Sequence, residues 1–403
     1  MMSKKSPQLR FEGFTDDWEQ RKLNEVSDIY DGTHQTPKYQ DNGVMFLSVE
    51  NIKTLTSNKF ISREAFEDEF KIRPQRGDVL MTRIGDIGTA NVVETDEDLA
   101  YYVSLALFKS EELNPYFLQA SIYAPFVQDQ IWKRTLHIAF PKKINKNEIG
   151  QVPINVPTLA EQTKIGSFFK QLDNTITLHQ RKLDLLKEQK KGYLQKMFPK
   201  NGAKVPELRF AGFADDWEER KLGDFSDVRD GTHASPKYIS EGHPMVTSKN
   251  LTHSGLDMTD VSFLTDEDFD EINKRSKVSI GDILFGMIGT IGNPVIVYRD
   301  DFAIKNVALI KEKSSNPIIN KWLLQYLKSP SFNRFIQKEN AGGTQKFIAL
   351  GLIRDMNLRV PKKEEQQKIG SFFKHLDDTI ALHQRKLDLL KEQKKGFLQK
   401  MFV

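Results

Sequence analysis

The sequence predicts a mixed α/β (α+β) fold in which two pseudo-repeated globular domains are joined by two long helices that form an antiparallel coiled coil. The chain has 403 residues, too many for one compact core, so two or more domains are expected. The sequence also consists of two related halves, and each half ends in a long segment with heptad-spaced apolar residues. Length, repetition and heptad spacing together define this architecture.

The repeated segments lie at the two ends of each half of the chain. LRFEGFTDDWEQRKLNEVSDIYDGTH, residues Leu9–His34, recurs as LRFAGFADDWEERKLGDFSDVRDGTH, residues Leu208–His233, an offset of 199 (208 − 9). EQTKIGSFFKQLDNTITLHQRKLDLLKEQKKGYLQKMF, residues Glu161–Phe198, returns as Glu365–Phe402, an offset of 204 (365 − 161). The second copy therefore gains five residues (204 − 199) between two fixed ends.

The interior of each half diverges between these ends. The IGDIG turn at Ile84 still aligns with IGTIG at Ile288, but Asn42–Phe70 and Gly242–Ile272 share little beyond length. The matched ends indicate that each half presents the same surface to the same kind of partner. The divergent interiors indicate that the two halves contact different targets. Gene duplication with drift is the alternative, although drift would not spare about 38 residues of exposed helix while erasing the interior.

Each long segment is predicted to be a single helix. Pro157 precedes Glu161–Phe198, Pro199 follows it, and no proline interrupts it. At about 1.5 Å per residue the helix would be roughly 57 Å long, more than one small domain can cover. The two apolar seams are predicted to form the helix-pair interface through Ile165, Phe169, Leu172, Ile176, Leu183 and Leu186 with Ile369, Phe373, Leu376, Ile380, Leu387 and Leu390.

Four polar residues also fall on the seam: His179, Lys190, His383 and Lys394. Polar residues at such positions often fix the register of a coiled coil at some cost in stability. Metal binding by the histidines is the alternative, but lone histidines at helical spacing are seldom metal ligands.

The predicted domain boundaries follow from the repeats: a first recognition domain at 1–156, a helical spacer at 157–199, a second domain at 200–360 and a second spacer at 361–403. Within the domains, Asp78–Arg83 and Val295–Tyr298 are predicted strands, and Asn114–Gln130 and Asn320–Asn340 are predicted helical stretches. DGT, GD and IG pairs mark the turns between them.

Composition excludes several classes of protein. The absence of cysteine removes disulfides, thiolate zinc sites and cysteine nucleophiles, and it fits a reducing cytoplasm. No apolar run of about 18 residues occurs and no apolar stretch follows the first lysines, so neither membrane insertion nor secretion is expected. The net charge of +4 and the pI of about 8.8 permit a nucleic-acid partner without requiring one.

No motif for catalysis is present, and no catalytic or metal-binding residue is predicted. The phosphate-binding GxxxxGK[ST] loop, GxSxG and HExxH are all missing. Asn114-Pro115-Tyr116-Phe117 comes nearest to an amino-methyltransferase motif but lacks its second proline, and therefore indicates the start of a helix. His34 and His233 stand in the repeated DGTH turns, where turn capping is the more typical role.

Several motifs of the chain resemble those of a known family. DDWE…RKL…SD…DGTH…PKY, the GD-(I/V)-L strand, the IGxIG turn and EQxKIGxFF followed by KLDLLKEQKK resemble the specificity subunits of Type I restriction–modification enzymes. The resemblance covers essentially the whole chain, and several of its motifs recur twice in the family's order.

The resemblance implies a non-catalytic, DNA-binding subunit. Such a subunit reads a bipartite, asymmetric site in double-stranded DNA, one half-site for each recognition domain, and the helix pair acts as a ruler for the unread gap. Two DNA adenine-N6 methyltransferase (modification) subunits would dock on it, and two restriction (motor-endonuclease) subunits would then join. No cofactor is expected in this chain, since S-adenosylmethionine, ATP and magnesium would belong to those partners.

The residues that read DNA do not follow from the resemblance, because recognition loops vary within the family. Arg, Lys, Asn and Gln read base edges, and Lys, Arg, Ser and Thr hold phosphates. The predicted contacts are Asn51, Lys53, Arg73, Arg76, Arg83, Lys142 and Lys143 in the first half, and Lys249, Asn250, Arg275, Lys277, Thr344, Gln345 and Lys346 in the second. Any one of them could equally be an ordinary surface charge.

Two other functions remain open. A stand-alone, sequence-specific DNA-binding regulator would explain the basic loops, but no helix-turn-helix or zinc-finger pattern is present. A coiled-coil scaffold that binds only protein would explain the helices, but not the divergent interiors. DNA binding by the isolated chain would favour the regulator, and the lack of any base preference would favour the scaffold.

Overall fold

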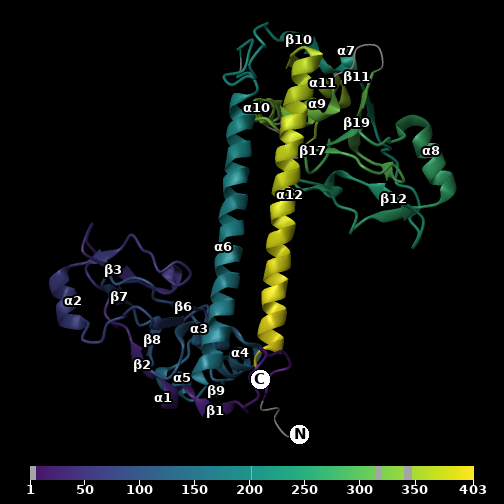
Figure 1. Cartoon of the computed structure of the whole chain (residues 1–403). Coiled ribbons are helices and arrows are strands. Elements are labelled where there is room, and N and C mark those ends of the chain that lie inside the picture. Colours follow the sequence, from purple (N-terminus) through teal and green to yellow (C-terminus); the bar gives the residue numbers. More distant parts are fainter. Residues whose placement is uncertain (1–5, 201, 314–318, 340–346) are drawn as a thin grey trace. The chain divides into compact units, whose positions relative to one another are not determined.

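The computed structural model describes residues 6–200, 202–313, 319–339 and 347–403. These residues divide into two compact units (Figure 1). The first unit consists of Met1–Arg181 with Arg385–Val403, and the second is Lys182–Gln384. Each unit thus contains one globular domain together with one end of each long helix.

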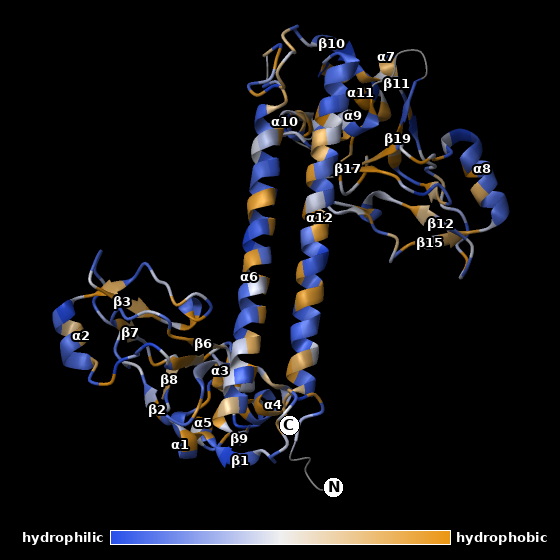
Figure 2. Ribbon diagram, viewed as in Figure 1, coloured by the Kyte–Doolittle hydropathy of each residue, from blue (hydrophilic) through white to orange (hydrophobic). Residues whose placement is uncertain are grey.

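The two long helices are α6 (Leu159–Lys196) and α12 (Lys363–Lys400). In the first unit Phe168 of α6 meets Phe397 of α12, with ring centroids 4.9 Å apart. In the second unit Tyr193, near the end of α6, meets Phe372, near the start of α12, at 5.0 Å. The start of each helix therefore packs on the end of the other, which confirms the predicted antiparallel pair; hydrophobic and hydrophilic stretches alternate along both helices (Figure 2).

The predicted seam positions are buried to different degrees. Ile165, Phe169, Leu183, Leu186, Ile369, Phe373 and Leu387 are buried, and Leu172, Ile176, Leu376, Ile380 and Leu390 are half-buried. The positions nearest the helix ends belong to the cores of the globular domains, because Ile165 and Phe169 join the core of the first and Ile369 and Phe373 that of the second. The seam residues therefore fasten the helices to the domains as well as to each other.

Both seam lysines form ion pairs with the opposite helix. Lys190 Nζ lies 2.5 Å from Asp377 Oδ1 in the second unit, and Lys394 Nζ lies 2.6 Å from Asp173 Oδ1 in the first. The two pairs are equivalent at the 204 offset (394 − 190 and 377 − 173). Each pair links α6 to α12, so these lysines favour one register of the antiparallel pair.

The globular domain of the first unit contains a four-stranded sheet ordered β2-β8-β5-β6, a three-stranded sheet ordered β4-β3-β7, and the pair β1-β9. Its elements are β1 (Glu19–Lys22), α1 (Leu23–Val26), β2 (Asp28–Asp31), β3 (Val44–Leu47), η1 (Val49–Asn51), β4 (Phe60–Ile61), α2 (Arg63–Glu69), β5 (Val79–Thr82), β6 (Ala90–Val92), β7 (Leu99–Tyr101), β8 (Leu105–Lys109), α3 (Pro115–Tyr123), α4 (Pro125–Lys133), α5 (Lys146–Gly150) and β9 (Pro153–Val156).

The globular domain of the second unit repeats this order as β11-β19-β16-β17, β15-β12-β18 and β10-β20, and adds the small pair β13-β14. Its elements are β10 (Glu218–Lys221), α7 (Leu222–Phe225), β11 (Ser226–Asp230), β12 (His243–Val246), η2 (Ser248–Asn250), β13 (Leu251–Thr252), β14 (Gly255–Leu256), β15 (Ser262–Leu264), α8 (Asp266–Ser276), β16 (Ile283–Gly286), β17 (Gly292–Ile296), β18 (Ala303–Ile304), β19 (Val307–Glu312), α9 (Asn320–Lys328), α10 (Pro330–Glu339), α11 (Leu350–Arg354) and β20 (Asn357–Val360).

The central sheet of each domain is covered on both faces, as alternation along its strands requires. In β5, Val79 and Met81 pack into the cluster that contains α3, α4 and the start of α6. Leu80, between them, packs into the cluster formed with the three-stranded sheet and α2. The three-layer arrangement therefore places the long helices on one face of the sheet and the divergent three-stranded sheet on the other.

The two predicted helical stretches are helical, and each consists of two helices. The stretch Asn114–Gln130 is two helices, α3 and α4, and Asn320–Asn340 begins as α9 and continues as α10. Each break falls immediately before Pro125 or Pro330, because a proline removes a backbone donor and disfavours helical geometry in the residue before it. The predicted strand Asp78–Arg83 contains β5, whereas Val295–Tyr298 overlaps only the end of β17, which stops at Ile296.

The repeated opening segment fastens each domain to both long helices. In the first unit, the Arg10 guanidinium donates two hydrogen bonds of 2.7 Å to the carboxylate of Glu161 in the first turn of α6. Trp18 packs edge-on against Phe402, just beyond the end of α12, with centroids 6.0 Å apart. The backbone N–H of Leu9 donates to the carbonyl of Lys400 at 2.8 Å. The C-terminal residues of the chain thereby complete the core of the N-terminal domain.

The second unit repeats these contacts. Arg209 donates two hydrogen bonds, of 2.6 and 2.7 Å, to Glu365 in the first turn of α12. Trp217 packs against Phe198 at 6.4 Å, beyond the end of α6, and Leu208 donates to the carbonyl of Lys196. The recurrence explains why the LRF, DDWE and LQKMF motifs appear twice, since all of them serve this attachment.

Candidate DNA interface

The repeated DGTH turns are built around paired carboxylates, Asp31, which is half-buried, and Asp230, which is buried. A Cβ at Gly32 would collide with the carbonyl of Tyr101, so only glycine lets the turn approach β7 this closely. Asp31 forms an ion pair with Arg83, whose side chain is buried and also donates to the carbonyl of Ile144 at 3.2 Å. Arg83 therefore links the DGTH turn, the IGDIG turn and the loop that precedes α5.

In the second domain the equivalent aspartate has different partners. Asp230 accepts a hydrogen bond from His233 Nε2 at 2.9 Å and forms an ion pair with Arg275. His233 Nδ1 lies 2.8 Å from the side-chain oxygen of Asn306. Burial on its own would raise the pKa of Asp230. The hydrogen bond from His233 and the charge of Arg275 outweigh burial and hold this pKa below its usual value. The histidine is thus part of a turn network, the role predicted for it.

Several predicted DNA contacts are engaged within the protein. Asn51 accepts a hydrogen bond from the N–H of Ser48 and donates to the carbonyl of Thr56, so it stabilises the turn at η1. The equivalent Asn250 is buried and donates to the carbonyls of Asp257 and Asp260. A DNA contact by Asn250 would require these bonds to be replaced. The structure therefore gives both asparagines a structural role within their turns.

All four arginines of the predicted set also have intramolecular partners. Arg73 forms an ion pair with Glu67 and lies 4.5 Å from the ring centroid of Phe66. Arg76 donates two hydrogen bonds of 2.7 Å to Asp96, in an exposed pair. An exposed pair contributes little to stability, so the Arg76 guanidinium can exchange its carboxylate for a phosphate or a base edge more readily than the buried Arg83 can.

Arg76 and Lys53 line one wall of a cleft of about 670 Å³ in the first unit. The long helices also line this cleft, through residues that include Lys170 and Lys394. Lys170 Nζ lies 3.0 Å from Glu94, on the Arg76 side. The cleft is a polar junction where the recognition domain meets the helix pair. Arg76, Lys170 and Lys394 are paired there with carboxylates, whereas the exposed Lys53 takes part in no ion pair of the described residues.

The remaining predicted cations of the first domain stand on the loop between α4 and α5. The carbonyl of Lys142 accepts from the N–H of Gly85, and that of Lys143 from the N–H of Leu136, both at 2.8 Å. Both side chains are exposed, and in the described part of the chain neither takes part in an ion pair. These two lysines are therefore available to an anionic partner.

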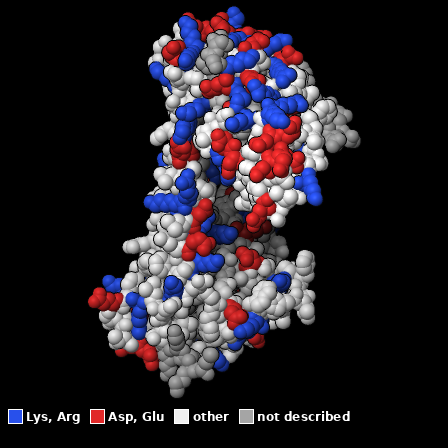
Figure 3. All heavy atoms as spheres, turned by 90° about the vertical axis from the view of Figure 1, so that its right-hand side faces the viewer, with Lys and Arg blue, Asp and Glu red and all other residues white. Residues whose placement is uncertain are grey.

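In the second domain, Lys249 pairs with Asp260 at 3.0 Å, and Lys277 is exposed beyond the end of α8. Thr344, Gln345 and Lys346, the predicted contacts of the AGGTQK loop, lie outside the described residues. The first turns of α8 expose Asp266, Glu267, Asp270 and Glu271, and acidic side chains gather over this helix (Figure 3). This acidic face would repel DNA, whereas Arg275 and Lys277 at the other end of α8 would attract it.

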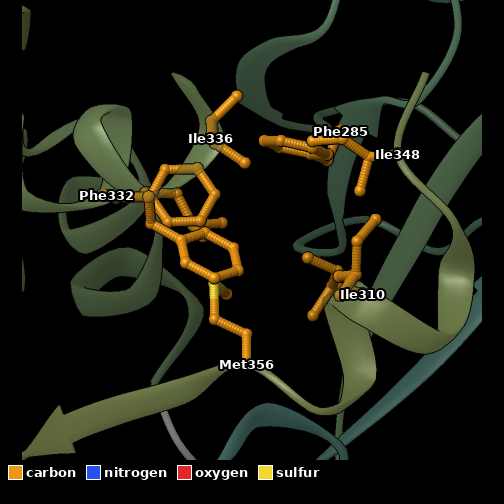
Figure 4. Close-up of a pocket in the computed structure, with 9 residues that line it drawn as sticks. Phe285, Ile310, Phe332, Ile336, Ile348 and Met356 are labelled. Carbon is orange, nitrogen blue, oxygen red and sulfur yellow. The ribbon is translucent and has the colours of Figure 1, made fainter. Parts of the chain in front are cut away.

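The described residues were also searched for metal-ligand clusters, membrane-spanning helices and ligand pockets. Within the described ranges, no three His, Asp or Glu side chains are grouped as metal ligands. No helix in the described part of the chain is both long and apolar enough to span a bilayer. A hollow of about 10 Å³ in the second domain is lined only by apolar side chains such as Phe285, Phe332 and Met356 (Figure 4), which is a packing gap without polar partners for a ligand.

One half-buried cation, Lys328, distinguishes the two units. Tyr123 is the last residue of α3, and Lys328 is the last residue of α9, its counterpart. In the first unit Lys394 Nζ lies 5.1 Å from the ring centroid of Tyr123, a favourable cation–π contact. In the second unit Lys328 replaces the ring, and burial together with the charge of Lys190 lowers the pKa of Lys328 to about 8.

This difference predicts a pH-dependent stability. A lysine whose pKa is about 8 in the folded chain and 10.5 as a free side chain binds fewer protons when folded, so the free energy of unfolding should rise as the pH increases from 8 towards 10.5. Lys328→Met should stabilise the protein at pH 7 by about 1–3 kcal/mol and remove this rise. Urea unfolding at pH 7 to 10 checks this, with exposed Lys277→Met as the control. The same pH profile for Lys328→Met and wild type would contradict it.

Comparison with known proteins decides the family. The family described as Type I restriction modification DNA specificity domain matches residues 15–188 and again residues 214–392. The chain belongs to this family. The chain is also 22% identical over 382 residues to the Type I restriction enzyme MjaVIII specificity subunit of Methanocaldococcus jannaschii, over 88% of this chain and 84% of that protein.

Two further relatives agree with this assignment. The Type I restriction enzyme HindI specificity subunit of Haemophilus influenzae is 25% identical over 198 residues, 47% of this chain and 41% of that protein. The crystal structure of the S subunit of a Type-I restriction-modification system from M. genitalium has the same fold, with a TM-score of 0.69, 15% identity and 99% of both chains covered. The chain is thus a Type I specificity subunit with two DNA recognition domains, as the sequence motifs predicted.

Proposed function

We propose that this specificity subunit directs DNA adenine methylation to a bipartite site, with one half-site read by each recognition domain. The observation that carries the proposal is that the two domains share one strand order and one attachment to the helices, while their three-stranded sheets differ in sequence. A shared frame places two readers in the same way, and different interiors allow each reader a different half-site. The helix pair would then set the length of the unread gap.

The partners are part of the same proposal. Two adenine-N6 methyltransferase subunits would dock on the matched surfaces of the two units, and two motor–endonuclease subunits would join through them. S-adenosylmethionine, ATP and magnesium would be bound by those partners. The exposed faces of α6 and α12 support protein docking, since Leu178 and Leu185 on α6 and the equivalent Leu382 and Leu389 on α12 are largely exposed.

Co-expression with a Type I adenine methyltransferase subunit from the same source tests this function. The complex should be purified, and N6-methyladenine should be mapped across the genome of the host. We expect one new methylated motif, made of two short half-sites around a fixed gap. A stable complex that leaves no new methylated motif would instead support a coiled-coil scaffold that binds only protein. Tight site-specific binding by the isolated chain would support a stand-alone DNA-binding regulator.

A further inference from the structure

The loop between α4 and α5 projects two large apolar side chains into solvent. Ile138 is 99% exposed and Phe140 is fully exposed, although apolar side chains of this size are normally at least partly covered. The tip that they form has no place in the core and no role in holding the helices. Burial against a partner is the simplest physical reason for keeping such side chains at a loop tip.

The base of the loop holds this tip in place. The N–H of Leu136 donates to the carbonyl of Lys143 at 2.8 Å, so residues 137–142 form a closed loop. Trp132, at the end of α4, lies beneath it: Lys142 Nζ is 4.6 Å from the Trp132 ring centroid, and the ring of His137 is 4.2 Å from it. Ile138 and Phe140 are thus presented on an anchored support.

The charge around the tip identifies the kind of partner. Between Asp129 and Glu148 the sequence contains five Lys and Arg residues and no Asp or Glu. Four of these cations, Arg134, Lys142, Lys143 and Lys146, take part in no ion pair of the described residues. Lys133 pairs with Asp129 at the far end of the segment, and Arg134 donates to Gln130. A strongly basic segment around a bare apolar tip fits a polyanion with an apolar interior, which double-stranded DNA is.

We propose that Ile138 and Phe140 form an apolar wedge that inserts at a base step within or beside the half-site of the first recognition domain, while Lys142 and Lys143 hold the flanking phosphates. The inference rests on the proposed function and adds a mode of recognition to it. Partial unstacking by apolar side chains is easiest at flexible steps such as TA and CA. The wedge would therefore select sequence through deformability as well as through base edges.

The test uses the complex with the methyltransferase subunit and duplexes that carry the motif from methylation mapping. Ile138→Ala/Phe140→Ala should lower affinity for the intact site by about tenfold to a hundredfold, since both side chains lose their burial. 2-Aminopurine, placed in turn at each position of the first half-site other than the methylated adenine, should fluoresce more strongly at one step with wild type and not with the double variant. Substitution of fully exposed side chains should leave the unfolding midpoint unchanged.

Matched variants separate the wedge from other roles of the loop. Phe140→Leu keeps an apolar tip and should retain most of the affinity, whereas Lys142→Ala/Lys143→Ala should weaken binding to all sequences alike and reduce its salt dependence. Unchanged affinity and fluorescence in the double alanine variant would overturn the wedge. Loss of methyltransferase co-purification would overturn it as well, because the tip would then be a protein contact. A wild-type complex with no methylated motif would overturn the proposed function itself.

Discussion

Replacing Arg10 by alanine is expected to lower the free energy of unfolding of the first unit by about 3–5 kcal/mol. Arg10 forms a bidentate pair with Glu161, whose side chain is only 1% exposed. Removal of the guanidinium leaves a carboxylate buried at the start of α6 without its cation. The cost of an unpaired buried charge exceeds what the intact pair contributes, so the effect should be far larger than that of an exposed pair.

Two variants make this result specific. Arg21→Ala removes an exposed ion pair of 3.3 Å with Glu25, and it should cost about 0–1 kcal/mol. Arg10→Met combined with Glu161→Leu removes both charges, and it should recover most of the stability lost in Arg10→Ala. Urea unfolding of the intact chain measures all three. A loss no larger than that of Arg21→Ala would show that the buried pair does not fasten the domain to the helix.

Lengthening the helix pair is expected to lengthen the unread gap of the DNA site and to leave both half-sites unchanged. Four residues inserted after Arg181 in α6, with four after Gln384 in α12, would add about 6 Å to each helix. That length corresponds to roughly two base pairs of B-form DNA. Four-residue insertions are tolerated in coiled coils as local changes of supercoiling, so the seam should re-form on both sides.

Methylation mapping of the lengthened chain measures the gap directly. Gln171→Ala with His375→Ala, two exposed and equivalent helix positions, changes the same helices without changing their length and should keep the original gap. A motif with the original gap in the lengthened chain would contradict the ruler. A motif with altered half-sites would contradict it too, since the helices would then take part in reading bases.

The repeats made the architecture predictable, because they carry the contacts that hold it together. The heptad seam and the LRF, DDWE and LQKMF attachment motifs consist of particular residue types at fixed spacing, which the sequence alone reveals. The structure confirms the antiparallel pair. Pro125 and Pro330 also indicate where each helical stretch divides into two helices. The apolar pattern continues across both prolines, so hydrophobic spacing alone does not reveal the break.

The candidate interface was less predictable, because a side chain's availability depends on partners far away in sequence. Arg83 is an ordinary arginine in the sequence, yet the fold buries it between Asp31 and the carbonyl of Ile144. Asn250 is likewise occupied by carbonyls that only the folded turn brings together. Phe140 is the opposite case, because an aromatic side chain is expected in a core. Only the structure shows that it lies exposed at a loop tip. Its one sequence signal is the acid-free basic segment around it.

Exchange of one recognition domain tests the proposal that each domain reads its own half-site. The pairs β1-β9 and β10-β20 have the same register, with Glu19 opposite Val156 and Glu218 opposite Val360, so residues 19–156 can be replaced by residues 218–360 at matched junctions. Methylation mapping of this hybrid should yield two copies of the half-site that the second domain reads, with the half-site of the first domain absent. Persistence of the first half-site in the methylated motif of the hybrid would contradict the claim.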